Sequence, residues 1–83
     1  MRSLRMGERQ VAGRAVTYYL LAEELEIPGE YYGVGVESAG GERVSVPGIT
    51  VSQSRIAELV GLLIRGAVTP ATLRDVVEDW LAR

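Results

Sequence analysis

Three carboxylates near the C-terminus are the first side chains whose spacing suggests chemistry. Asp75, Glu78 and Asp79 are spaced at i, i+3 and i+4, so on a helix they would share one face and could bind a hard cation. Such a site needs more oxygen ligands than one helix face supplies, and no second acidic cluster is placed to complete it. Asp79 also precedes Arg83 by four residues, as in an ordinary helical ion pair. We therefore interpret this group as a solvated helix face and predict no metal site.

Four glycines superficially suggest a phosphate-binding loop: Gly33, Gly35, Gly40 and Gly41. Loops of that kind connect a strand to a helix N-terminus. Here Gly33 and Gly35 fall inside a β-like segment, and the other two fall in the turn that follows it. We expect no phosphate or cofactor site. Gly33 and Gly35 instead leave one face of a strand bare, where an aromatic ring or another backbone can approach.

The basic residues concentrate at the N-terminus, where Arg2, Arg5, Arg9 and Arg14 could contact nucleic-acid phosphates. The chain as a whole has a formal net charge of −2, and it has no RNA-binding aromatic motif. Its C-terminal part has helix–turn–helix-like spacing, but the second helix would present the three carboxylates to the DNA phosphates. We therefore keep a nucleic-acid-associated regulator that uses the arginine-rich N-terminus only as the alternative function.

The composition removes several kinds of catalysis. The chain contains no cysteine and no histidine, which excludes disulfides, thiolate chemistry, cysteine zinc sites and the usual near-neutral proton shuttle. Serine and threonine have no histidine base, and tyrosine or glutamate would need a shaped pocket that a domain this small rarely encloses. We predict that the protein is not an enzyme and has no catalytic residue, no cofactor and no small-molecule substrate.

Length and hydropathy indicate one soluble domain. The 83 residues are 47% hydrophobic and 24% charged, as in an ordinary globular protein. The first residues lack an apolar run like a signal-peptide core, and the apolar stretch at 56–68 is interrupted by Glu58 and Arg65 and too short to span a bilayer. We expect a cytoplasmic protein without a membrane partner.

The element that must organise the chain is residues 15–22, its longest β-biased apolar run. Before it, residues 4–11 alternate as an edge strand, with a turn at Ala12-Gly13. After it, Pro28-Gly29 has the residues of a type II turn, and strands are expected at 31–37 and 43–46. The last strand ends at Pro47-Gly48.

The apolar period then changes from two to about 3.6, which predicts two helices. Ser52 is the expected N-cap of the first helix, which Gly66 ends; Thr69 is the expected N-cap of the second, with Pro70 at its first position. Trp80 is expected at the edge of the pair because its indole N–H needs a partner. The helices should dock through Ile56, Leu59, Leu63, Leu73, Val77 and Leu81.

Together these elements predict one α+β domain over residues 1–83. Residues 1–51 form a four-stranded antiparallel meander, and residues 52–83 form two amphipathic helices packed on one of its faces.

Two-residue turns at Ala12-Gly13 and Pro28-Gly29 would fix the register of the sheet. The opposite pairs would be Met6 with Tyr19, Leu4 with Leu21, Leu21 with Val36 and Tyr32 with Leu25. This register favours a core face formed by Leu4, Met6, Tyr19, Leu21, Val34, Val36, Val44 and Val46. Simple alternation favours the other face, and a loop one residue longer would reverse the assignment.

The favoured register leaves one apolar stripe of the central strand uncovered. The predicted interaction face consists of Val16, Tyr18, Leu20, Ala22, Gly33 and Gly35. Contiguous exposed apolar surface usually marks an interaction site, and two identical chains stacked about a two-fold axis would bury it. We therefore predict a protein–protein interaction module, a homodimer or a binder of another protein. In the alternative, Tyr18 lies over the two glycines and shields the stripe within the monomer.

Three segments resemble a family of small uncharacterised bacterial proteins that is typical of clostridial, spore-forming lineages. They are Tyr18-Tyr19-Leu20-Leu21, residues 32–37, and residues 68–70 together with residues 73–80. The most specific part is the Thr-Pro-x-x-Leu-x-Asp-Val-Val-Glu-Asp segment that begins at Thr69, and the resemblance extends from about Arg14 onward. The family is a domain of unknown function, so the resemblance implies a bacterial cytoplasmic protein and assigns no catalytic residue.

Overall fold

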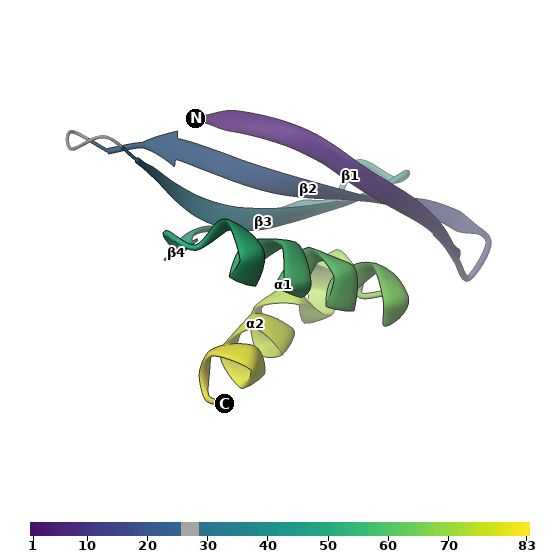
Figure 1. Ribbon diagram of the computed structural model, residues 1–83. Coiled ribbons are helices and arrows are strands. Elements are labelled where there is room, and N and C mark those ends of the chain that lie inside the picture. The colour runs from purple at the N-terminus through teal and green to yellow at the C-terminus, as the bar shows by residue number, and fades with distance from the viewer. Residues whose placement is uncertain (26–28) are drawn as a thin grey trace.

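The sheet is an antiparallel meander with both helices on one side (Figure 1). The computed structural model describes residues 1–25 and 29–83. The strands follow the order β1-β2-β3-β4, with β1 (Arg2–Val11), β2 (Arg14–Glu24), β3 (Glu30–Ser38) and β4 (Arg43–Thr50). The helical part comprises α1 (Gln53–Arg65), the 3-10 turn η1 (Pro70–Thr72) and α2 (Leu73–Leu81). The predicted α+β class and element order are confirmed.

The first hairpin has the expected turn but a different register beyond it. Val11 pairs with Arg14, and the two turn residues Ala12 and Gly13 have φ values of 52° and 80°, as a type I′ turn requires. The register shifts between Arg5 and Gly7, so Met6 is the extra residue of a β-bulge. Leu4 therefore lies opposite Leu20 and not Leu21, and Tyr19 lies opposite Arg5 and not Met6.

The second hairpin overturns the predicted register. The last pair is Glu24 with Glu30, so residues 25–29 connect the strands where a two-residue turn was expected. Leu21 pairs with Gly33 and not with Val36. The expected Leu25–Tyr32 pair is also wrong, because Tyr32 lies opposite Ala22; Pro28, which the predicted turn required, lies outside the described residues. The pairing of β2 with β3 is therefore displaced by three positions from the predicted one. Because three is an odd number, residues of β2 that were predicted to share a face with Val34 and Val36 lie on the opposite face.

The core consequently lies on the face that alternation indicated. Val16, Tyr18 and Ala22 of β2 are buried against the helices, whereas Leu4 and Met6 are exposed. The predicted core positions Val34 and Val36 are confirmed, and Val44 and Val46 pack against the core half-buried. The remaining buried members of the cluster are Tyr32, Ile56, Leu59, Val60, Leu63, Val68, Leu73, Val77 and Trp80.

The two predicted helix caps differ in outcome. The Ser52 hydroxyl accepts a hydrogen bond from the Arg55 N–H at 3.2 Å, which confirms the first cap. Thr69 occupies the N-cap position of η1, but its hydroxyl makes no capping hydrogen bond within the described part of the chain. Its Oγ1 lies 3.4 Å from Oγ1 of Thr72 instead. The second helix thus begins with a 3-10 turn, and the predicted Thr69 side-chain bond is wrong.

Gly66 ends α1 as expected, in a Schellman arrangement. The Ala67 N–H donates to the Ile64 carbonyl at 3.1 Å, and the Val68 N–H donates to the Leu63 carbonyl at 3.0 Å. Ala67 takes the left-handed position, with a φ of 50°. This turn directs Val68 back into the core.

Five of the six predicted docking residues are buried, and the exception is Leu81, which is 54% exposed. Leu81 is the last residue of α2, so its side chain lies beyond the core. Trp80 is buried, and the Arg55 guanidinium lies 4.6 Å from the centre of its ring. Among the described residues, neither helix is long and apolar enough to cross a membrane.

Candidate interaction surface

The stripe predicted as an interaction face lies beneath the helices. Val16, Tyr18 and Ala22 are buried and Leu20 packs partly against the core, so they are not a free surface. Tyr18 does not cover the glycines either, because its hydroxyl donates a hydrogen bond to the Val68 carbonyl at 2.9 Å. The physical cause is the five-residue connection after β2, which turned this stripe toward α1.

The two glycines of the predicted face lie in β3, and their surroundings differ. A Cβ at Gly33 would lie 2.4 Å from the Val46 carbonyl oxygen and 2.6 Å from Pro47 Cα. The expected close approach of another backbone is therefore confirmed at Gly33, where β4 occupies the space. A Cβ at Gly35 would make only ordinary contacts, the nearest at 3.5 Å with the Ser45 hydroxyl.

The sheet face turned away from the helices carries Tyr19 and Leu21, by alternation with Tyr18 and Leu20. Leu21 is already buried there. Arg43 reaches across this face, with its guanidinium 5.0 Å from the centre of the Tyr19 ring and its Nη2 donating to the Ser3 hydroxyl at 3.4 Å. A charged side chain thus covers the part of this face around Tyr19 within the monomer.

Exposed apolar side chains concentrate instead at the start of the chain, on the edge strand β1 and at the residue directly before it. Met1, Leu4 and Met6 are 73%, 45% and 45% exposed; we call these three residues the β1 patch. Because β1 forms one edge of the sheet, its outward backbone N–H and C=O groups are open to pairing with another chain. Within residues 1–6, apolar side chains are therefore exposed on, or directly before, an open strand edge.

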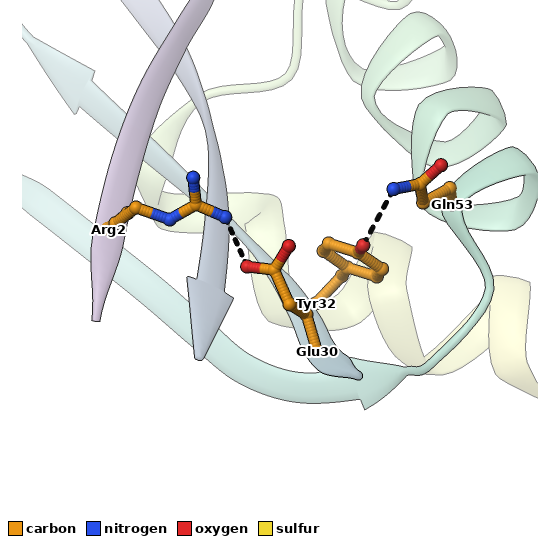
Figure 2. Close-up of polar contacts among 4 residues, drawn as sticks. All are labelled: Arg2, Glu30, Tyr32 and Gln53. Carbon is orange, nitrogen blue, oxygen red and sulfur yellow. Dashed lines mark hydrogen bonds and ion pairs between the residues drawn. The ribbon is translucent and has the colours of Figure 1, made fainter. Parts of the chain in front are cut away.

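A groove with a volume of about 360 Å³ lies beside this patch, between the sheet and the start of α1. Its floor is apolar, and Leu4 belongs both to the groove and to the β1 patch. Figure 2 shows two polar pairs at the groove. Arg2 forms an ion pair with Glu30, and Gln53 Nε2 donates to the Tyr32 hydroxyl at 3.0 Å. The full lining is Arg2, Leu4, Leu20, Ala22, Glu30, Tyr32, Gln53 and Ile56.

The polar groups at this groove are engaged with one another. The hydrogen bond to Glu30 raises the pKa of the Arg2 guanidinium, which stays charged. Tyr32 and Gln53 bind each other in the same way. The free part of the groove is therefore its apolar floor, which suits an apolar side chain of another polypeptide.

The N-terminal arginines do not form one basic patch. Arg9 Nη1 donates to the carbonyls of Ile64 at 3.0 Å and Arg65 at 3.4 Å, at the C-terminal end of α1. Arg2 also lies on the helix side, whereas Arg5 lies on the other face and binds Glu8 at 2.7 Å. No local sequence signal indicated the Arg9 contact, because its partners are 55 and 56 residues away.

The remaining candidate residues lie apart from this surface. Asp75, Glu78 and Asp79 are exposed on α2. In the described ranges, no three His, Cys, Asp or Glu side chains are grouped so that they could hold a metal ion. Gly40 and Gly41 lie in the turn between β3 and β4.

Comparison with known proteins gives one match. The model of a family described as "Family of unknown function (DUF6514)" matches residues 4–83. No curated protein and no solved structure matches the chain.

Proposed function

We propose that the chain, which belongs to the family of unknown function DUF6514, is a protein–protein interaction module that self-associates through β1. The observation that carries this proposal is the β1 patch, where Leu4 and Met6 are exposed on an open edge strand and Met1 is exposed directly before it. Exposed apolar side chains gain free energy when a partner removes them from water. An open edge supplies backbone hydrogen bonds to the same partner.

A second copy of the chain is the simplest partner for such an edge. Two identical β1 strands pair antiparallel about a two-fold axis, and each copy then satisfies the open backbone groups of the other. The four-stranded sheets of the two copies continue as one sheet. The apolar floor of the groove beside Leu4 extends the contact beyond the strand itself.

The geometry does not favour nucleic-acid binding. Arg2, Arg5 and Arg9 each have an acceptor within the chain, and they lie on two different faces of the sheet. A basic footprint needs its cations gathered on one face.

Sedimentation velocity at micromolar concentrations tests the proposal. We expect the wild type to sediment as a dimer and a Leu4→Glu variant as a monomer, because two carboxylates would be forced into the interface. Leu81→Glu is the matched control, since Leu81 is a similarly exposed leucine, on α2, and this variant should remain dimeric. A monomeric wild type would refute the proposal. A dimer that Leu81→Glu disrupts while Leu4→Glu does not would place the interface on α2.

A further inference from the structure

We infer that the two copies pair β1 against β1 with the two-fold axis between the two Leu4 residues. This inference rests on the proposed self-association and specifies its register. In an antiparallel pair of identical strands, symmetry places one residue directly opposite its own copy. The identity of that residue fixes every other pair, so the register can be argued from the side chains of β1.

Repulsion between like charges excludes several residues of β1 from the position at the two-fold axis. If Arg5, Glu8 or Arg9 were central, two identical charges would lie opposite each other at the short cross-strand distance. If Gly7 were central, the bulge at the neighbouring Met6 of each copy would interrupt the pairing directly beside the axis. These registers cost binding free energy because the second copy always repeats the unfavourable contact.

The β-bulge excludes a further register. Met6 is the extra residue of the bulge, so an axis at Met6 would place two interrupted ladders at the centre of the contact. The regularly paired part of β1 on the N-terminal side of the bulge runs from Arg2 to Arg5. An axis at Ser3 lies within this part, but it pairs fewer residues and leaves Met6 outside the contact.

An axis at Leu4 satisfies all these conditions. The partner's Leu4 then lies against Leu4, at the rim of the apolar groove of each copy. Met6 lies opposite the partner's Arg2, whose aliphatic stem can cover the thioether. Arg5 lies opposite the partner's Ser3, so no like charges face each other. The exposed leucine is thus the centre of the contact, and Met1 and Met6 flank it.

Pairing about an axis perpendicular to the sheet keeps equivalent faces on the same side. Leu4 lies on the helix side, because it lines the groove together with Ile56 of α1. The helices of both copies therefore cover the same face of the joined sheet, and the two grooves lie on either side of the paired leucines.

Cysteine cross-linking tests the register, because the natural chain contains no cysteine. Directly opposite residues have Cα atoms about 4.5–5.5 Å apart, within the range of about 4.4–6.8 Å that a disulfide accepts. We expect Leu4→Cys to convert mostly to a covalent dimer under mild oxidation, measured by a non-reducing gel. Gln10→Cys, on the same strand and also exposed, is the control and should remain largely uncoupled.

A mixing experiment leaves Leu4 intact. Chains with Ser3→Cys and chains with Arg5→Cys are mixed in equal amounts, and we expect the mixed covalent dimer to form several times faster than either homodimer, because residues 3 and 5 are opposite in this register. Equal rates for all three products, with a dimeric wild type, would overturn the register and leave self-association standing. A monomeric wild type would refute both the proposed function and this inference.

Discussion

At the residue scale, Tyr18 connects the central strand to the turn between the helices. Its side chain is 0% exposed, and its hydroxyl donates to the Val68 carbonyl at 2.9 Å. We expect Tyr18→Phe to lower the free energy of unfolding by about 1–3 kcal/mol, because the carbonyl loses this donor in a buried setting. Chemical denaturation measures the change. Tyr31→Phe, at an exposed tyrosine, should change stability by less than about 0.5 kcal/mol; equal effects would contradict the role of this bond.

The same tyrosine should make stability depend on alkaline pH. Burial raises the pKa of Tyr18 above its ordinary value of 10.0. The folded state therefore holds the phenol proton more tightly than the unfolded state does. Its stabilising contribution is complete below pH 10 and is lost as the pH rises through the raised pKa. In denaturation series above pH 10, the wild type should lose more stability than Tyr18→Phe, and parallel curves would contradict this linkage.

Gly33 and Gly35 form a matched pair on one strand. A Cβ at Gly33 would overlap the Val46 carbonyl at 2.4 Å, whereas a Cβ at Gly35 has room. We expect Gly33→Ala to cost about 1–3 kcal/mol, because the β4 backbone must move. Gly35→Ala should be neutral or stabilise by up to about 1 kcal/mol, since alanine loses less backbone entropy on folding. Thermal denaturation of both variants tests this. A larger loss of stability in Gly35→Ala than in Gly33→Ala would contradict the close approach of β4 to Gly33.

At the element scale, the two helix starts should respond differently to loss of their hydroxyl. Ser52→Ala removes the hydrogen bond to the Arg55 N–H and should cost about 0.5–2 kcal/mol. Thr69→Ala removes a hydroxyl that contacts Thr72 and caps no backbone N–H in the described part of the chain. Its cost should stay below about 0.5 kcal/mol, and a loss equal to that of Ser52→Ala would restore Thr69 as a side-chain cap. Denaturation midpoints compare the two.

The elements themselves were largely predictable because their signals are local, although β4 continues through Pro47 and Gly48 to Thr50, beyond its predicted end. The 3.6-residue period located both helices, and the Ala12-Gly13 turn was recognised from its two residues. The register was not predictable, because it depends on how many residues leave the ladder at a connection. The five residues after β2 and the bulge at Met6 each moved the pairing, and together they placed Tyr18 and not Tyr19 under the helices.

An exposed apolar surface was predicted, but on the wrong residues. An apolar stripe was expected to remain uncovered, but the expected residues belong to the core, and the exposed ones lie on β1. Leu4 and Met6 were assigned to the core by the same register error. The contact of Arg9 with the end of α1 joins residues that are far apart in the sequence. Such contacts produce no periodic pattern from which the sequence could predict them.

At the scale of the whole molecule, the helices protect one sheet face, Arg43 crosses the other, and the edge at β1 remains open. A small domain has little stability in reserve. If the folded chain is the form that self-associates, a second copy adds stability by mass action, because the unfolded chain has no β1 edge to pair. Stability and association should therefore rise together.

This coupling predicts a melting temperature that depends on concentration. Each tenfold increase in chain concentration above the dissociation constant favours the dimer by about 1.4 kcal/mol, or about 0.7 kcal/mol per chain. For a domain of this size, that corresponds to a rise in melting temperature of roughly 3–6 °C. Calorimetry of the wild type between low and high micromolar concentration should show this rise, and Leu81→Glu should behave in the same way. Leu4→Glu should melt at one temperature throughout, because it has lost the partner. A wild type whose melting temperature stays constant over a hundredfold range would show that folding and association are not linked through β1.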